Sequence, residues 1–226
     1  MTNYQKLLAV VFLAAWFITS INPVYREAWF LENILVFIFV PVLIVAAQYF
    51  KLSDVSYTFI TLFMVIHLVG AHYTYGEVPF GFTLQEWLDA SRNMYDRFAH
   101  FSFGFLMVYP IREMFVHATG ARGFWAYYFP LDIILSFSAI YEILEWAAVN
   151  IIDASNGVLF LATQGDVFDS AKDMGSALLG ATIAMAIVLA LNWALNREEF
   201  RGEMKESLRI KGQRRTGRIP IRELVR

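Results

Sequence analysis

The chain has no cysteine, which excludes a disulfide framework and a thiolate metal site in its 226 residues. Charged residues are also scarce, at 17% of the sequence, whereas apolar residues reach 58%. Soluble domains typically contain about 25% charged and about 45–50% apolar residues. Together with a mean hydropathy of +0.50, this composition predicts an integral membrane protein.

Several familiar motifs are missing from the sequence. It contains no nucleotide-binding glycine loop, Walker motif, serine-nucleophile elbow or haem-ligand pattern. It also lacks an obvious internal repeat, and no basic segment is interleaved with aromatic residues in the manner of a nucleic-acid-binding domain. We therefore expect one membrane domain that does not bind nucleic acid.

Six stretches are long and apolar enough to cross a bilayer as helices. A helix rises about 1.5 Å per residue, so about 20 residues cover a hydrocarbon core about 30 Å thick. The first run is followed by no small-residue cleavage site and is interpreted as a retained span rather than a secretory signal. We predict an all-α, polytopic transmembrane bundle within residues 1–195, with spans at Tyr4–Ile21, Ile34–Phe50, Val55–His72, Tyr95–Met114, Phe124–Asn150 and Gly175–Leu195.

The distribution of cations predicts the orientation. Lys6, Lys51, Arg112, Arg122 and ten cations of the C-terminal segment lie on one side, fourteen in all, against four on the other side. The positive-inside rule places the richer side, with both termini, in the cytoplasm. The compact chain suggests a bacterial inner membrane. Residues 196–226 then form a basic cytoplasmic tail, which is expected to bind anionic lipid at about 1 kcal/mol per Lys or Arg near the surface.

The loop between the third and fourth spans, residues 73–93, is rich in aromatic residues. Its sequence Thr83-Leu84-Gln85-Glu86 fits a capping box and predicts a short helix that starts there. Aromatic side chains favour the headgroup zone, so this helix is expected to anchor the loop at the outer interface. A lid over a nearby site is the alternative.

Acidic residues and histidines gather at the predicted outer end of the spans. Asp96 and His100 stand one turn apart on the fourth span, with Arg92 one turn earlier. A carboxylate can orient a neighbouring imidazole, or both groups can ligate a metal. Asp96 beside Arg97 could equally be an interfacial ion pair that marks the start of the span.

The fifth span carries Glu142 and Glu145 three residues apart on one face. Two such carboxylates repel each other unless one holds a proton or both meet a cation. Ionisable side chains inside a membrane are costly, so this pair is a candidate functional site.

Before the last span, Asp166, Asp169 and Asp173 follow i, i+3, i+7 spacing and would form one stripe on a helix. Acidic residues suit a helix N-terminus, which accounts for one or two of them. Ser176, Gly180 and Ala184 then give small residues at every fourth position, a pattern that predicts close packing against another helix.

The third span contributes two histidines, His67 and His72. They are five residues apart and diverge by about 140° at about 100° per residue, so both cannot face one point. We predict His72 as the site member and His67 as a buried histidine bonded to a neighbouring helix.

These groups predict one outer-facing pocket. Its candidate catalytic residues are Asp96, His100, Glu142, Glu145 and Asp169; its candidate substrate-binding residues are Arg92, Arg97 and His72. Oxygen and imidazole ligands suit a divalent cation, and the hypothetical ligands are Asp166, Asp169, Asp173, Glu142 and His100. With Glu142 or Asp169 as base, the pocket would serve a metal- or acid/base-dependent enzyme acting on a lipid or envelope precursor.

Two other functions fit the same residues. Intramembrane Asp, Glu and His are typical of proton- or cation-coupled transporters, although the sequence shows neither duplicated halves nor interrupted helices. A non-catalytic scaffold with a structural polar network is the second alternative. In that case Arg92, Arg97 and Lys172 would have to satisfy the six carboxylates of the cluster, which are Asp96, Glu142, Glu145, Asp166, Asp169 and Asp173.

The segments Asp96–His100, Glu142–Trp146 and Thr163–Asp169, with Lys172-Asp173-Met174 after them, resemble the YjdF-type bacterial inner-membrane proteins. From Asp96 onward the chain more loosely resembles the VanZ-like group, which shares an Asp-x-x-x-His helix and acidic later segments. Met174-Gly175 stands where that group usually has an Asn. The first resemblance implies a bacterial inner-membrane protein. VanZ-like proteins are associated with glycopeptide resistance, and the resemblance to them supports the candidate site and leaves the function open.

Overall fold

A computed structural model describes residues 1–149 and 163–209, so Asn150 and most of the basic tail lie outside the described residues. All regular secondary structure in these ranges is helical, which confirms the all-α class. The elements are α1 (Asn3–Ser20), α2 (Arg26–Tyr49), α3 (Asp54–Tyr73), the 3-10 turn η1 (Tyr75–Glu77), α4 (Pro79–Trp87), α5 (Tyr95–Thr119), α6 (Trp125–Val149), α8 (Asp169–Leu195) and α9 (Arg197–Ser207).

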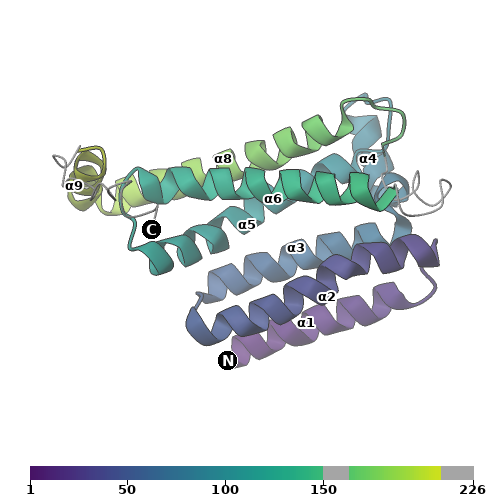
Figure 1. Ribbon diagram of the computed structural model, residues 1–226, viewed down its shortest axis with the longest axis horizontal. Coiled ribbons are helices and arrows are strands. Elements are labelled where there is room, and N and C mark those ends of the chain that lie inside the picture. Colours follow the sequence, from purple (N-terminus) through teal and green to yellow (C-terminus); the bar gives the residue numbers. More distant parts are fainter. Residues whose placement is uncertain (150–162, 210–226) are drawn as a thin grey trace, which may run out of the picture.

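The long helices form two layers that meet at α3 and α5. Figure 1 shows α1, α2 and α3 in one layer and α5, α6 and α8 in the other. The central helix α5 packs against α3, α6 and α8. The N-terminus and α9 lie toward one end of the bundle, while α4 and the start of α8 lie at the other end (Figure 1).

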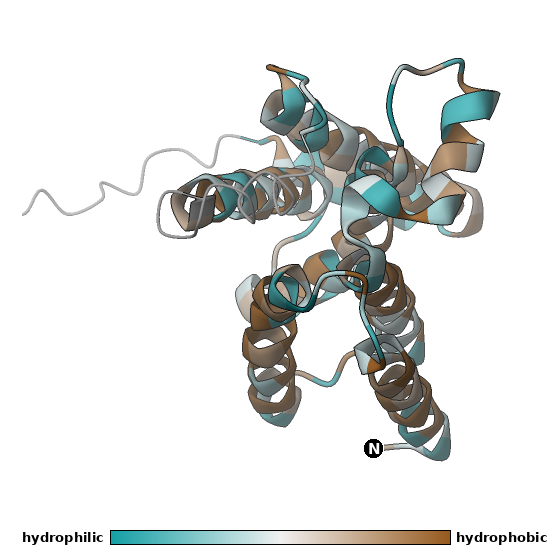
Figure 2. Cartoon of the chain, turned by 90° about the vertical axis from the view of Figure 1, so that its right-hand side faces the viewer, coloured by the Kyte–Doolittle hydropathy of each residue, from teal (hydrophilic) through white to brown (hydrophobic). Residues whose placement is uncertain are grey.

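The outer surface of the bundle is apolar. Helix α1 has no buried residue, and α2 exposes Ile34, Phe37 and Ile38; Figure 2 shows this apolar colouring along the helices. Among the described helices, α2, α3 and α8 have both the length and the apolar composition needed to cross a membrane. Such exposed apolar surface is unfavourable in water, so the protein is a membrane protein.

Two helices extend beyond their predicted membrane spans. Helix α2 starts at Arg26 rather than Ile34, and α8 starts at Asp169, ahead of the span predicted from Gly175. Asp169 and Asp173 thus lie on a helix, as their spacing predicted, whereas Asp166 lies before it. The predicted boundaries followed hydropathy, whereas a helix continues through polar residues when their side chains find partners in the bundle. These extra turns bring Glu32 and Asp173 into the helical bundle.

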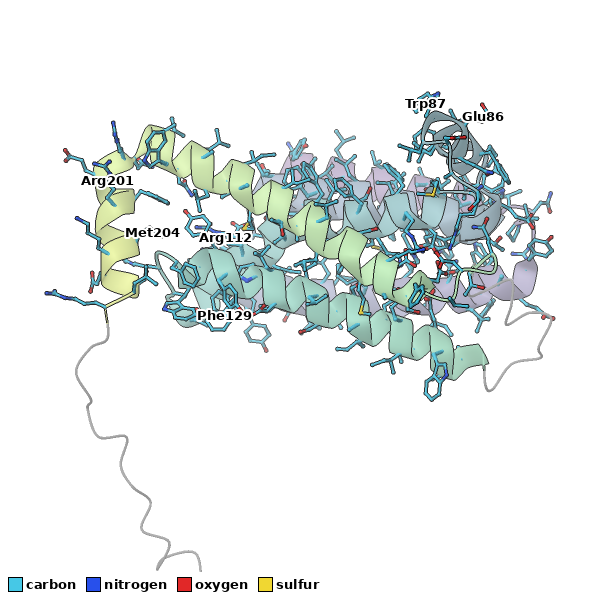
Figure 3. The ribbon with its side chains drawn as sticks, turned by 90° about the horizontal axis from the view of Figure 1, so that it is seen from above. Glu86, Trp87, Arg112, Phe129, Arg201 and Met204 are labelled. Carbon is cyan, nitrogen blue, oxygen red and sulfur yellow. The ribbon has the colours of Figure 1, made fainter. Side chains whose placement is uncertain are left out.

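The predicted surface helix is present as α4, but its predicted start was wrong. It begins at Pro79, because proline is favourable at the first helical position, and Thr83 lies inside it. Gly81 allows close packing, since a Cβ atom there would lie 1.8 Å from Asn93 Oδ1. Figure 3 shows Glu86 and Trp87 projecting from this end of the molecule, and Trp87 is 72% exposed.

Small residues bring α5 and α8 into close contact. A Cβ atom on Gly104 would lie 1.8 Å from the carbonyl oxygen of Ala177, and one on Gly180 would lie 2.2 Å from that of Phe101. Gly180 and Ala184 are buried in this seam, as their spacing predicted, whereas the Ser176 hydroxyl donates to the Lys172 carbonyl. The seam fixes the first turns of α8 beside those of α5, where the candidate site lies.

Helix α9 is fixed to the connection between α5 and α6. Trp125 Nε1 donates to the Ser207 carbonyl at 3.0 Å, and the Phe124 N–H donates to Ser207 Oγ at 2.9 Å. This helix has four glutamates against three cations, so it is not itself basic. The predicted binding of anionic lipid therefore depends on the cations from Arg209 onward, nearly all of which lie outside the described residues.

Candidate functional site

The charged residues of three helices meet at the end of the bundle that carries α4. The start of α5 supplies Asp96, Arg97 and His100, and the start of α8 supplies Asp169 and Asp173. The second half of α6 supplies the two glutamates. The structure divides this group into two sides, one organised by arginines and the other by His100.

On the arginine side, two guanidinium groups hold α8 against α5. Arg97 Nη2 lies 2.6 Å from Asp169 Oδ1 and 3.2 Å from Asp166 Oδ2, and Arg97 also pairs with Asp173. Arg92 pairs with Asp169 and lies 3.5 Å from Asp96 Oδ2. The two arginines predicted to bind substrate are thus engaged by carboxylates of the protein.

Asp166 lies just before α8 and closes this side. Lys172 Nζ lies 2.6 Å from Asp166 Oδ2, and the Phe168 N–H donates to Asp166 Oδ1 at 3.0 Å. These bonds favour the ionised carboxylate and hold the pKa of Asp166 below its ordinary value, with Lys172 as the main cause. Asp166 is therefore a charged anchor for the loop.

The same loop is bonded to the start of α5. The Asn93 N–H donates to Gln164 Oε1 at 2.9 Å, and Gln164 Nε2 donates back to the Asn93 carbonyl at 3.2 Å. Arg92 Nη1 donates to the Thr163 carbonyl at 3.0 Å. Asn93 is 1% exposed, but it was not predicted as a site residue. The one feature of the sequence that points to it is its position between α4 and the start of α5.

On the other side, an imidazole lies among carboxylates. His100 Nε2 is 3.5 Å from Glu142 Oε1 and 3.7 Å from Asp96 Oδ1. Asp96, His100 and Asp173 each offer a ligand atom, and these atoms lie within 4.8 Å of one another. Glu142 Oε1 and Asp173 Oδ1 are buried without a hydrogen-bond partner. Buried polar atoms rarely lack partners, so this donor set fits a hard divalent cation.

The predicted metal ligands are therefore not all brought together. Glu142 and His100 lie on the imidazole side, and Asp166 and Asp169 lie on the arginine side. Asp173 stands between the two, since it pairs with Arg97 and also offers an oxygen to the group of Asp96 and His100. Asp96, which was predicted only as a catalytic residue, lies among the candidate ligands. The cation site that the geometry supports is thus Asp96, His100 and Asp173, with Glu142 beside them.

His72 lies against α1 instead of pointing to this cluster. Its Nδ1 is 2.9 Å from the Thr19 carbonyl oxygen, so the structure does not bring it to the other predicted substrate-binding residues. His67 is buried, as predicted, with Nε2 at 3.1 Å from the Glu32 carbonyl and Nδ1 at 2.6 Å from the Tyr75 hydroxyl. A carbonyl only accepts, so Nε2 carries the proton and Nδ1 accepts from Tyr75.

A further acidic residue comes from α2. Glu32 is 4% exposed, and its Oε2 accepts from the Tyr141 hydroxyl at 3.1 Å. The Tyr141 ring packs edge-on to the His100 imidazole at 5.9 Å, and Glu145 lies one turn after Glu142 on α6. Glu32 was not predicted as a site residue, because the second span was predicted to start after it.

Comparison with known proteins supports the assignment to the bacterial inner membrane. A family model described as "Predicted membrane protein (DUF2238)" matches residues 4–194. The inner membrane protein YjdF of Escherichia coli (strain K12) is 39% identical over 165 residues, which are 72% of this chain and 78% of YjdF. No solved structure matches.

The resemblance to YjdF-type proteins is thereby confirmed, whereas the looser resemblance to the VanZ-like group stays a prediction. Because the family model covers α1 through nearly all of α8, it includes the whole candidate site. The chain belongs to the DUF2238 family of predicted membrane proteins.

Proposed function

We propose that this protein is an enzyme of the bacterial inner membrane that acts at the outer leaflet on a lipid or lipid-linked envelope precursor. One observation carries the proposal: Glu142 Oε1 and Asp173 Oδ1 are buried without hydrogen-bond partners beside the close group of Asp96, His100 and Asp173. Both carboxylates have a cation nearby, since His100 Nε2 lies 3.5 Å from Glu142 Oε1 and Arg97 pairs with Asp173. Buried oxygens that nevertheless accept no hydrogen bond are costly at the end of a membrane bundle, and this cost supports a role in binding or catalysis.

Each group has a definite part in this proposal. Asp96, His100 and Asp173 would hold a divalent cation, which supplies Lewis-acid activation of a phosphoryl or carbonyl oxygen. Glu142 is the better general base, because Asp169, the other predicted base, accepts from both Arg92 and Arg97. The arginines hold Asp169 and Asp173 in place. An anionic headgroup would bind to the arginines in competition with these carboxylates.

The proposed topology has six spans, with both termini in the cytoplasm and the site at the outer face. The alternating direction of the long helices and the placement of the N-terminus and α9 toward one end (Figure 1) support it. Helix α5 has 25 residues and is long enough to span, although the charged residues Asp96, Arg97, Arg112 and Glu113 make it less apolar than α2, α3 and α8. The excess of fourteen cations over four supports the orientation.

This topology predicts opposite labelling of two single-cysteine variants of the cysteine-free chain. In intact spheroplasts, a membrane-impermeant maleimide should label Glu86→Cys on α4 but not Arg201→Cys on α9, two positions at opposite ends in Figure 3. Permeabilised cells should show equal labelling of both variants. Labelling of Arg201→Cys in intact cells would reverse the proposed orientation.

A small cation- or proton-coupled transporter is the second candidate, and one observation favours it. Ser138 lies one turn before Glu142 on α6, is 2% exposed, and its hydroxyl has no hydrogen-bond partner. It extends the polar face of α6 away from the imidazole side toward the middle of the helix. A path for ions would need such polar steps beyond the cluster.

The enzyme proposal is tested by the lipids that the protein changes. Purified parent protein in vesicles of bacterial polar lipid extract, supplied with Mn²⁺, should generate product lipids detectable by mass spectrometry. Glu142→Gln should lower the rate by at least about 100-fold, the usual contribution of a general base, whereas Glu113→Gln, at the far end of α5, serves as control. Unchanged lipids with the parent would contradict the proposal, and ion flux in the same vesicles would favour the transporter.

A further inference from the structure

The two helices that flank the imidazole side belong to different layers. Figure 1 shows α2 and α6 in front of α3 and α5, one in each layer. Among the described elements, α2 packs chiefly on α3, while α6 packs on α5 and α8. The hydrogen bond from the Tyr141 hydroxyl to Glu32 Oε2 therefore joins two helices that are otherwise loosely packed against each other.

An apolar pocket of about 230 Å³ lies farther along the same helices. It is lined by Phe50, which follows α2, by Ile111, Met114 and Phe115 on α5, and by Ile133 and Phe137 on α6. With a rise of about 1.5 Å per residue, the lining residues of α6 lie about 8 to 14 Å from Glu142, and those of α5 lie about 16 to 27 Å from His100. The pocket thus lies at the depth of the hydrocarbon, mostly in the half of the bundle away from the acidic end, where the end of a long acyl chain would reach it.

We propose that this flank binds one bilayer lipid, with its headgroup at His100 and Glu142 and its acyl chain in the apolar pocket. The lipid enters sideways from the membrane between α2 and α6, past the Glu32–Tyr141 hydrogen bond. This inference rests on the proposed function and specifies its substrate class as a membrane lipid that keeps its chain in the bilayer.

The side chains around the path favour a lipid over a water-soluble ligand. Ile140 and Leu144 lie beside Tyr141 on α6 and are 51% and 60% exposed, so the approach along α6 from the membrane is apolar. The groups behind them are polar and buried, since Glu142 is 8% and Glu32 4% exposed. An apolar approach with a polar end matches the two parts of a lipid.

The Glu32–Tyr141 hydrogen bond also links the entry of a lipid to movement of the Tyr141 ring beside His100. Tyr141 contacts the His100 ring with its own ring and donates to Glu32 with its hydroxyl. Passage of a headgroup requires this hydroxyl to leave Glu32, which moves the ring that packs on His100. A single hydrogen bond contributes about 1 kcal/mol net, so the barrier it adds can be overcome by thermal motion.

The test measures lipid that remains bound to the full chain. Protein from vesicles of phosphatidylethanolamine and phosphatidylglycerol is exchanged into lipid-free detergent and examined by native mass spectrometry. We expect one retained phospholipid on the parent, none on Ile133→Trp, which fills the pocket, and one on the control Leu179→Trp, at a 56% exposed position of α8. Ala118→Leu, at another residue that lines the pocket, is a milder second variant. A parent without lipid, or pocket variants that retain it, would overturn the proposal.

The access path is tested by exchange of a deuterated phospholipid. Tyr141→Phe keeps the ring and loses one hydrogen bond, so release should be about fivefold faster, whereas Glu32→Gln should change it less, because the amide oxygen still accepts. Tyr127→Phe is the matched control, since its hydroxyl bonds to Asn192 elsewhere in the bundle. Equal rates in Tyr141→Phe and the parent would exclude this path. Retained lipid on a protein that binds no divalent cation would uphold the lipid site and reject the metal-dependent enzyme.

Discussion

Asp173→Asn and His100→Ala should each lower the affinity of the purified protein for Mn²⁺ by more than about 100-fold, because removing a ligand costs more than the 10–100-fold loss seen for residues that only orient ligands. Both side chains belong to the group whose ligand atoms lie within 4.8 Å of one another. Asn keeps the shape of Asp173 but removes its charge, so packing in the α5–α8 seam is preserved. Isothermal titration calorimetry in detergent, after treatment with a chelator, measures the affinity.

Asp166→Asn is the informative control, since the sequence predicted Asp166 as a ligand and the structure pairs it with Lys172 and Arg97. Its effect on Mn²⁺ affinity should stay below about tenfold, because it lies outside the ligand group. Equal losses for Asp166→Asn and Asp173→Asn would place the cation on the arginine side. Absence of Mn²⁺ binding in the parent would remove the metal from the proposed function and favour a structural polar network.

The helical architecture follows from simple features of the sequence. The apolar runs of α1 and α3 are bounded by polar residues, so hydropathy alone gave their ends closely. The small residues Gly180 and Ala184 predicted the close contact that α8 makes with α5, because only small side chains allow two helix backbones to approach. Local patterns of this kind depend on one helix at a time.

The partners of the charged residues could not be predicted in this way. Spacing placed Asp166, Asp169 and Asp173 on one stripe and predicted one shared cation. The structure instead has Asp169 facing Arg92 and Arg97, while Asp173 Oδ1 lies without a hydrogen-bond partner. Such pairing depends on the rotation of α8 against α5, which no spacing within a single helix encodes.

Glu32 shows a second limit of sequence reasoning. Its charge interrupted the apolar run and moved the predicted start of the second span to Ile34, although the helix begins at Arg26. The carboxylate is tolerated because Tyr141, more than 100 positions later in the chain, donates to it. Partners this distant in sequence come from tertiary packing, so the residues next to Glu32 in the sequence do not predict that it belongs to the site.

Arg97→Met should give the largest loss of stability, about 3 kcal/mol or more in the free energy of unfolding. Arg97 is 9% exposed and bonds to Asp169, Asp166 and Asp173. Methionine fills most of the volume but leaves the buried Asp173 without its arginine partner and Asp169 with Arg92 alone, which is costly in a low-dielectric interior. Reversible unfolding in mixed micelles of increasing SDS content, followed by tryptophan fluorescence, measures the change.

Lys172→Gln provides the comparison, because Lys172 pairs with the same loop but is 55% exposed. Exposed ion pairs contribute little, so this variant should stay close to the parent. The double variant Arg97→Met/Asp173→Asn should be more stable than the sum of its single effects predicts, since it removes both members of a buried pair. If the changes in the free energy of unfolding of the two single variants simply add, Arg97 stabilises the bundle through the packing of its alkyl chain. The ion pairs would then determine the position of Asp173 rather than the stability.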